Sequence, residues 1–396
     1  MTPSSMPHAG SASAVVNRRC TRCVMDTTDP EITFDAAGVC SYCQRFEEVF
    51  RPHWFPNDEG RRRLEATVAQ IKAEGRGRAY DCVIGLSGGV DSSFLAIKVK
   101  ALGLRPLVVH VDAGWNSELA VKNIETLVKA LGFDLFSLVI DWEEIRDLQV
   151  AFLRAGVPNQ DAPQDHAFFA GLYGFATREK IRWVLSGANF ATESILPSAW
   201  GYHALDVRQL LGIHARFGQR PLRTFPTVSF FNLHFGYPLV RRMKVFRPLD
   251  FMPYSQEAAV RELTADYGWR YYGAKHHESV WTKFFQGWLL PTRFGYDKRL
   301  AHLSSLVVTG QLTRVDALRE LERPAYAPDE LRRDRAFVLR KLGLSDAEFD
   351  LLVQQPLHTH RDYPSNEVAN RLAGELVHAL IVTSRKFRRR REAVTP

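Results

Sequence analysis

Short apolar runs alternate with amphipathic stretches between about residues 80 and 190 of this chain. Brief apolar runs predict buried strands, which we expect at residues 80–86, 106–112, 135–140 and 181–186. Helical periodicity lies between them. One expected helix covers residues 92–102 and ends at Gly103. A second begins after Asn116 or Ser117, either of which can cap it, and ends at Gly132. Strands that alternate with helices in this way predict an α/β fold with a doubly wound parallel sheet.

The pattern is helical on either side of this region. A charged helix is expected around residues 62–73, ahead of the first strand. From about residue 251 onward the apolar positions follow a helical period, which predicts a mostly helical C-terminal region. Its expected helices lie at residues 254–263, 278–290, 311–322 and 329–354. Ser255 can cap the first of them, and the aromatic stripe of the second is typical of a buried core.

The first predicted strand leads into a glycine-rich turn, Ser-Gly-Gly-Val-Asp-Ser at residues 87–92. Its glycines let the backbone approach a ligand, its serines add hydroxyl donors, and the N–H groups that open the next helix attract an anion. A Walker loop requires a lysine directly after its last glycine, and none follows here. An ordinary strand-to-helix turn is the alternative, but this spacing favours a phosphate site.

This turn resembles the PP-loop of the ATP pyrophosphatase family, which grips pyrophosphate and splits ATP into AMP and pyrophosphate. The resemblance implies that the whole turn binds the nucleotide, through Ser87, Gly88, Gly89, Val90, Asp91 and Ser92. Asp91 is in addition a candidate catalytic residue.

Polar residues follow two of the other predicted strands. Asp112 ends the second strand, and Asn189 and Glu193 come after the fourth, in a segment that resembles the Gly-x-Asn-x-x-x-Glu element of related synthetases. Ligands of doubly wound sheets bind outside the carboxyl ends of the strands, so we expect these three residues beside the nucleotide. The carboxylates of Asp112 and Glu193 are candidates for holding Mg²⁺, which prefers oxygen ligands. Each carboxylate taken alone is equally consistent with a solvated loop.

Four of the five cysteines form two pairs near the N-terminus: Cys20, Cys23, Cys40 and Cys43. Sixteen residues separate the pairs, and this spacing is typical of a zinc site. Four thiolates complete a tetrahedral shell, so the metal is expected to be structural, in a small zinc ribbon. Cys82 lies inside the first predicted strand and is expected to be a small core residue.

The net charge of +8 suggests nucleic acid, but six of these charges come from residues 385–391, which leaves +2 for the rest. Such a basic tail is most often a solvated segment, and nucleic acid is not the expected partner. No apolar run reaches the roughly 18 residues of a membrane span. Residues 1–16 lack the basic start and apolar core of a signal peptide, so we expect a disordered leader and a cytoplasmic protein.

Taken together, the motifs resemble the N-acetyl sugar amidotransferases of lipopolysaccharide and surface-polysaccharide biosynthesis, from about Cys20 to Glu322. The segments that carry the resemblance are residues 20–30, 38–43, 86–93, 111–118, 275–279, 294–299 and 301–305. The last two segments are the more specific evidence, because a generic PP-loop protein would not share them. Val90 and Ala188 depart from the family pattern, which often has Lys and Glu at these positions.

The resemblance implies an amidine synthesis. ATP would adenylate the acetamido oxygen of a nucleotide-linked N-acetyl sugar, and ammonia from a separate glutaminase and a cyclase-like subunit would then displace AMP. Asp91, Lys275 and His276 are the candidate catalytic residues, and either His276 or His277 is a candidate base. The charged residues around 275–299 can alternatively be surface groups.

Two other functions remain open from the sequence. A PP-loop tRNA-modifying enzyme is one, although no cysteine follows Cys82 for sulfur transfer. A non-catalytic zinc-ribbon scaffold with a nucleotide fold is the other, although residues 87–92 keep the whole motif. The expected organisation is a leader, a zinc module, a PP-loop domain, a helical substrate or partner region and a basic tail, at residues 1–16, 17–55, 56–250, 251–384 and 385–396.

Overall fold

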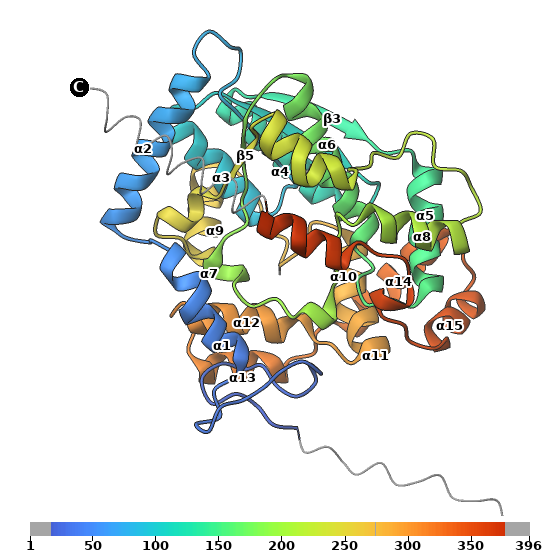
Figure 1. The fold of residues 1–396 in the computed structure, drawn as a ribbon. Coiled ribbons are helices and arrows are strands. Elements are labelled where there is room, and N and C mark those ends of the chain that lie inside the picture. The colour runs from blue at the N-terminus through green and yellow to red at the C-terminus, as the bar shows by residue number, and fades with distance from the viewer. Residues whose placement is uncertain (1–16, 274, 377–396) are drawn as a thin grey trace, which may run out of the picture.

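A five-stranded parallel sheet forms the centre of the chain in this computed structural model, which describes residues 17–273 and 275–376 (Figure 1). The strands are β1 (Cys82–Gly85), β2 (Pro106–Asp112), β3 (Asp134–Val139), β4 (Trp183–Leu185) and β5 (Lys244–Phe246). Their order across the sheet is β3-β2-β1-β4-β5, and every neighbouring pair is parallel. The order therefore reverses between β1 and β4, which confirms the predicted doubly wound α/β fold.

Helices flank the sheet and dominate the C-terminal half. Those that precede β5 are α1 (Ser41–Arg45), α2 (Asp58–Glu74), α3 (Val90–Ala101), α4 (Glu118–Leu131), α5 (Trp142–Ala155), α6 (Ala162–Arg178), α7 (Phe190–Glu193) and α8 (Val207–Phe217). Those that follow it are α9 (Gln256–Tyr267), α10 (Val280–Phe284), α11 (Leu290–Phe294), α12 (Lys298–Val308), α13 (Arg314–Glu322), α14 (Pro328–Leu342) and α15 (Asp346–Gln354). A wider helical turn, η6 (Phe285–Leu289), joins α10 to α11.

Local signals explain several of these boundaries. The Ser117 hydroxyl accepts a hydrogen bond of 3.2 Å from the Ala120 N–H and so caps α4, while Gly132 ends that helix in the left-handed conformation at φ 63°. Ser255 caps α9 in the same way. The edge strand β5 has only three residues, which is too short a run for a periodicity argument, and the sequence analysis did not predict it.

Side chains alternate between the two faces of the sheet, and each face has its own core. Val83, Leu107 and Val109 pack with the helices on one face, which include α5, α6, α10 and α14. Ile84 and Val108 pack on the other face with α2, α3, α4 and α9. Because α10 and α14 share a core with the sheet, the C-terminal helices are packed directly onto the α/β region; the predicted domain limits themselves stay a prediction.

The N-terminal cysteine module packs on the C-terminal helices. Its buried residues share a cluster with Leu300, Leu303 and Val308 of α12 and with Ala317 of α13, and Figure 1 shows α1 beside α12 and α13. The module thus contacts the helix that Lys298 begins. The expected leader at residues 1–16 and the basic tail at 385–396 lie outside the described residues.

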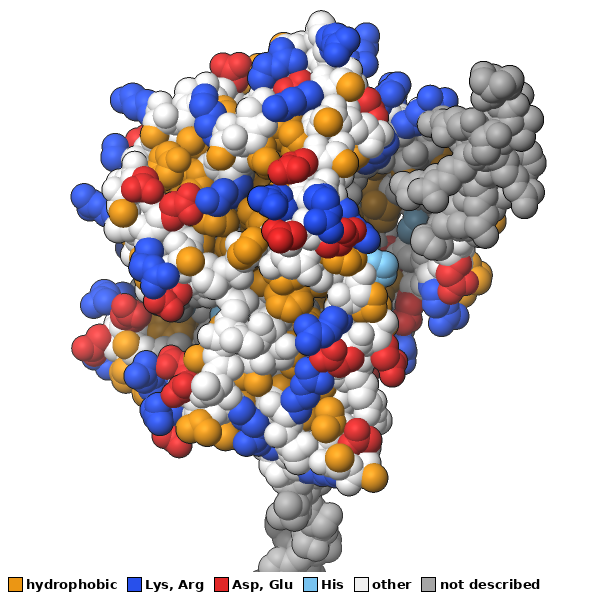
Figure 2. Space-filling view, turned by 90° about the vertical axis from the view of Figure 1, so that its left-hand side faces the viewer, with side chains coloured by type: hydrophobic (Ala, Val, Ile, Leu, Met, Phe, Trp, Pro, Cys, Tyr) orange, Lys and Arg blue, Asp and Glu red, His pale blue; other side chains and the backbone are white. Residues whose placement is uncertain are grey.

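Acidic and basic side chains are interspersed over the face that Figure 2 shows, with apolar side chains between them. That face therefore carries no continuous basic stripe of the kind that tracks a nucleic-acid backbone. Within residues 17–273 and 275–376, no helix combines the length and the apolarity of a bilayer span.

Candidate functional site

The glycine-rich turn lies at the point where the strand order reverses. Gly88 has a left-handed backbone with φ 82°, and Gly89 is the N-cap residue of α3. The hydroxyls of Ser87 and Ser92 lie 3.1 Å apart, and the Ser87 hydroxyl also accepts from the Gly89 N–H at 3.2 Å. The start of α3 therefore lies at the carboxyl edge of the sheet, which is the position that a phosphate-binding turn requires.

A cavity of about 210 Å³ opens in front of this turn. The residues that line it are Ser87, Gly89, Val90, Asp91, Ser92, Gly187, Ala188, Glu193, Gln256, Tyr272, Lys275, His276 and Glu278. The cavity therefore brings together the turn after β1, the segment after β4 and the residues around 275. Most of the site residues that the sequence suggested meet here.

Asp91 stands in the first turn of α3 and is held from three sides. The Tyr254 hydroxyl and the Asn189 side-chain amide both donate to its Oδ1, the latter at 3.3 Å, and Lys275 Nζ lies 3.6 Å from its Oδ2. Burial raises the pKa of Asp91, and the charge of Lys275 opposes that rise. The carboxylate is thus oriented by donors on separate elements and kept in a poorly solvated place.

Lys275 connects the C-terminal region to the rim of the sheet. Its Nζ lies 2.8 Å from Oε1 of Glu193 and 3.3 Å from the hydroxyl of Thr192. Burial would lower the pKa of Lys275, but the charges of Glu193 and Asp91 outweigh it and raise that pKa. The ammonium is therefore charged at neutral pH, and it faces the cavity.

Glu278 forms part of the cavity wall. A Cβ placed on Gly89 would come within 2.8 Å of its Oε1, so this carboxylate lies directly against the start of α3. The segments around Asn116 and Ser279 pair through a β-bridge and hold it there, with the Ser117 N–H donating to the Glu278 carbonyl at 2.8 Å.

His276 also lines the cavity, next to Glu278. Its Nδ1 lies 3.8 Å from Oε1 of Glu278, and its backbone is left-handed with φ 65°. Burial acts to lower the pKa of His276, but the hydrogen bond and charge of Glu278 outweigh it and raise that pKa. A protonated imidazole here adds a second cation beside Lys275.

Three of the suggested residues have other positions. The carboxylate of Asp112 accepts from the Gly114 N–H at 2.7 Å and from the Asn116 amide at 3.1 Å, so it organises its own loop and does not line the cavity. Asn189 caps α7 and reaches the site only through Asp91. Burial and the charge of Lys283 lower the pKa of His277 to about 4, and this residue also lies off the cavity lining.

Two tyrosines of the site were not anticipated. Tyr254 donates to Asp91, and the Tyr272 hydroxyl accepts from the Val90 N–H at 2.9 Å. Both follow β5 and stand far from the turn in the chain, so no local spacing pointed to them. The only available signal was the gathering of aromatic residues after residue 251.

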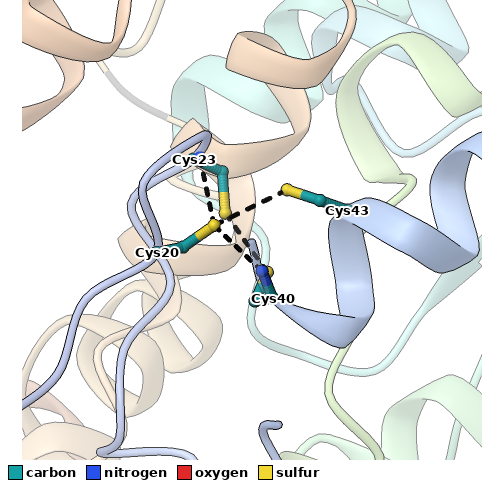
Figure 3. Close-up of side chains that lie close together, drawn as sticks. All are labelled: Cys20, Cys23, Cys40 and Cys43. Carbon is teal, nitrogen blue, oxygen red and sulfur yellow. Dashed lines mark hydrogen bonds between the residues drawn. The ribbon is translucent and has the colours of Figure 1, made fainter. Parts of the chain in front are cut away.

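The four N-terminal cysteines converge as the spacing predicts (Figure 3). All are buried, and their sulfur atoms lie within 4.8 Å of one another. The Sγ atoms of Cys23 and Cys40 are 3.6 Å apart and those of Cys20 and Cys43 are 3.9 Å apart. Tetrahedral zinc with bonds of about 2.3 Å requires sulfur atoms about 3.8 Å apart, so the donor set fits that ion.

Backbone N–H groups surround these sulfur atoms, which suits thiolate ligands. Cys20 Sγ accepts from the N–H groups of Cys23 at 3.4 Å and Cys40 at 3.2 Å. The Arg314 guanidinium donates to the carbonyls of Cys20 and Cys23 and fastens the module to α13. Cys82 lies buried in β1, where burial raises the pKa of its thiol, as expected of a core residue.

Residues 278–376 match the family model of the C-terminal domain of WbpG-like lipopolysaccharide biosynthesis proteins. This region is WbpG-like. The match begins at Glu278, on the cavity wall, and confirms the resemblance to surface-polysaccharide biosynthesis proteins that the motifs carried. Glu278 therefore belongs both to the cavity and to the WbpG-like region.

Part of the chain is also similar to a protein of another kind. A glutamine-hydrolyzing GMP synthase of Chlamydia caviae is 27% identical over 195 residues, which is 48% of this chain and 32% of that protein. The chain thus spans about a third of the length of this curated relative.

Two solved structures are also similar. An NMN synthetase of Francisella tularensis has a TM-score of 0.36 at 12% identity, over 72% of this chain and 96% of that one. An NH3-dependent NAD synthetase of Campylobacter jejuni has a TM-score of 0.29 at 12% identity, over 76% of this chain and 98% of that one.

Proposed function

We propose that the protein is an ATP-dependent amidotransferase that converts the acetamido group of a nucleotide-linked N-acetyl sugar into an acetamidino group, for surface-polysaccharide biosynthesis. One observation carries the proposal. The cavity has the glycine-rich turn as one wall and Lys275, His276 and Glu278 as the other, and Glu278 opens the WbpG-like region. The residues that suit ATP cleavage thus share one cavity with Glu278, the first residue of the WbpG-like region.

The reaction has two chemical steps. The acetamido oxygen attacks the α-phosphorus of ATP, an O–P bond forms, and pyrophosphate leaves. Ammonia then adds to the activated carbon, a proton is lost, and AMP leaves with the former acetamido oxygen. The amide is a poor electrophile, and adenylation turns its oxygen into a good leaving group. The protein must therefore position two substrates and stabilise charge.

The cavity residues divide these tasks. Backbone N–H groups at the start of α3 and the hydroxyls of Ser87 and Ser92 face the phosphates. Lys275 stabilises the negative charge that develops on the departing pyrophosphate. His276, close to Glu278, is the group placed to move a proton at the incoming nitrogen.

Asp91 and Glu193 offer the oxygen ligands that Mg²⁺ takes in phosphate sites, where one or two carboxylates suffice. Both carboxylates adjoin Lys275 on the cavity. The ion would neutralise phosphate charge. Asp112 is the weaker candidate, because its carboxylate is occupied within its own loop.

The remaining parts of the chain complete the proposal. Residues 56–250 carry the nucleotide, residues 251–384 contribute to the acceptor site, and a structural zinc on the four cysteines supports α12. A separate glutaminase with a cyclase-like subunit supplies the ammonia. We place the protein in the cytoplasm, where ATP and nucleotide sugars are available.

Purified protein mixed with ATP, Mg²⁺, ammonium salt and a panel of UDP- and CMP-linked acetamido sugars tests the proposal. Formation of AMP and pyrophosphate that depends on one sugar supports it. Formation of ADP, or turnover that no sugar changes, contradicts it. Turnover that instead depends on added tRNA, with steeply salt-dependent binding, would establish the tRNA-modifying alternative.

A further inference from the structure

Two adjacent serines of α12, Ser304 and Ser305, have no part in the chemistry described above. Both side chains are fully buried, and both belong to residues 301–305, one of the segments that carry the family resemblance. Consecutive residues of an α-helix point about 100° apart, so the two hydroxyls face different neighbours. This arrangement lets α12 contact two other parts of the chain at once.

Ser305 holds the segment that follows α7. Its hydroxyl accepts a hydrogen bond of 2.9 Å from the Ile195 N–H and donates to the Ala301 carbonyl of its own helix, also at 2.9 Å. Both contacts are buried. Removal of the hydroxyl would therefore leave the Ile195 N–H without a partner in a place that water does not reach.

The helix α7 depends on such contacts because it is a single turn, and the last carbonyls of a helix have no partners within it. Thr309 and Gln311, which follow α12, both donate to the Ala191 carbonyl, at 2.9 and 2.8 Å. Figure 1 shows α7 beside α12. Glu193 thus lies between two backbone groups that this region fixes, the carbonyl of Ala191 and the N–H of Ile195.

Ser304 faces the cysteine module. Its hydroxyl accepts from the Val24 N–H at 3.2 Å, and Val24 directly follows Cys23 in the chain. Ile195 belongs to the same buried apolar cluster as the four cysteines. The helix α12 is therefore hydrogen-bonded to the cysteine module on one side and to the segment that carries Glu193 on the other.

The position of α7 matters at the cavity. Glu193 lines the cavity, and its Oε1 lies 2.8 Å from Lys275 Nζ. The same ammonium donates to the Thr192 hydroxyl at 3.3 Å, so two consecutive residues of α7 hold it. A shift of α7 would therefore displace a candidate Mg²⁺ ligand and the lysine proposed to face the phosphates.

We propose, on the basis of the proposed function, that Ser304 and Ser305 are positioning residues through which the cysteine module holds Glu193 at the cavity. Ser305 fixes the end of α7, and Ser304 joins α12 to the loop that carries the first cysteine pair. Zinc on the four cysteines makes that loop rigid, so occupancy of the metal site sets the geometry of the cavity. Both serines act through Glu193 and its ion pair with Lys275.

Hydrogen–deuterium exchange, read by mass spectrometry on the full chain, tests the positioning without any need for turnover. We expect Ser305→Ala to speed exchange about tenfold or more in peptides that cover residues 189–196, because the Ile195 N–H loses its buried partner. Removal of zinc by a chelator should speed exchange in the same peptides, while those of α15 keep their rate. Ser304→Ala should speed the release of zinc to the chelator.

Thr67→Ala is the matched control, because the Thr67 hydroxyl donates to the Arg63 carbonyl of its own exposed helix, α2, at 2.8 Å. It should leave exchange at residues 189–196 unchanged. Unchanged exchange there in both Ser305→Ala and the zinc-free protein overturns the inference. An equal increase in the peptides of α15 also overturns it, because that result indicates general destabilisation.

A double-mutant cycle tests the catalytic consequence, with the acetamido sugar that supports turnover best. We expect Ser305→Ala to lower kcat for AMP formation about tenfold, with KM for the sugar within about twofold. In a Glu193→Gln background the same substitution should have no further effect, since Ser305 acts through Glu193. Equal losses of kcat in both backgrounds overturn the inference and leave the proposed function standing. A wild type that turns over no sugar contradicts the proposed function, while exchange at residues 189–196 still decides whether the metal site is coupled to α7.

Discussion

Lys275 Nζ lies 2.8 Å from Oε1 of Glu193 and 3.6 Å from Oδ2 of Asp91. One lysine from the C-terminal half thus joins the segment that follows β4 to the helix that follows β1. The contact brings a positive charge to the carboxyl edge of the sheet, where the turn itself carries no lysine. We therefore propose Lys275 as the phosphate cation that Val90 cannot supply.

Replacement of this lysine tests that role. We expect Lys275→Met to lower kcat for AMP and pyrophosphate formation by about 100-fold or more, because a preorganised charge at the reacting phosphate is lost. Lys275→Arg should keep part of the activity. Lys122→Met, at an exposed lysine on α4 that pairs with Glu125, is the control. Full turnover in Lys275→Met would exclude Lys275 from the chemistry.

Gly88 in the turn and Gly77 outside it allow a matched test of the backbone of the turn. Both have left-handed φ angles, 82° and 77°, but a Cβ on Gly88 would come within 2.7 Å of the Ala120 carbonyl oxygen, whereas a Cβ on Gly77 meets nothing within 4 Å. Gly77→Ala should cost only about 1–2 kcal/mol of unfolding free energy.

Gly88→Ala carries the same backbone strain and must also displace the turn from α4. We expect it to abolish ATP binding, measured by calorimetry, while Gly77→Ala binds normally. Equal ATP affinity in the two variants would show that the turn does not hold the nucleotide.

Metal analysis tests the cysteine cluster. We expect one zinc per chain in the purified protein and its loss in Cys40→Ser, while Cys82→Ala keeps it. Because the module packs on α12 and α13, removal of the metal should lower the thermal midpoint and expose the Lys298 end of α12 to proteolysis. A zinc-free protein with an unchanged midpoint would contradict a structural role.

His302 predicts a pH dependence of stability. Burial, with the charges of Lys275 and His276, lowers the pKa of His302 to about 3 in the folded protein, against about 6.5 when it is unfolded. Below pH 6.5 the unfolded chain binds a proton here that the folded chain does not. The free energy of unfolding therefore decreases as the pH falls from about 6.5 toward 3.

Urea unfolding at pH 7.5 and pH 5.5 measures this effect. We expect the wild type to lose about 1 kcal/mol more than His302→Gln over that interval. The exposed His53→Gln is the control and should follow the wild type. Identical losses in the wild type and His302→Gln would mean that His302 is not buried in its neutral form.

The sequence predicted the elements whose signals are local. Ser117 and Gly132 delimit α4, and the cysteine spacing predicts the cluster, because each depends on neighbours in the chain. Asp112 shows the limit of such signals. Its position at the end of β2 was predicted correctly, but its carboxylate makes hydrogen bonds inside its own loop and does not line the cavity. Where a side chain points depends on loop geometry, which strand periodicity does not specify.

Other parts of the site arise only from tertiary packing. Tyr254 reaches Asp91 across 163 positions of sequence, and Tyr272 reaches Val90 across 182. No spacing rule connects such residues, because the fold alone brings them together.

The fate of one oxygen atom tests the central claim most directly. The acetamido sugar that supports turnover is prepared with ¹⁸O in its acetamido carbonyl and incubated with the protein, ATP, Mg²⁺ and ammonium salt. If the acetamido oxygen is adenylated and then displaced by ammonia, mass spectrometry will find the label in AMP and the sugar product will have lost it. Unlabelled AMP beside a sugar that keeps its ¹⁸O would contradict the proposed reaction.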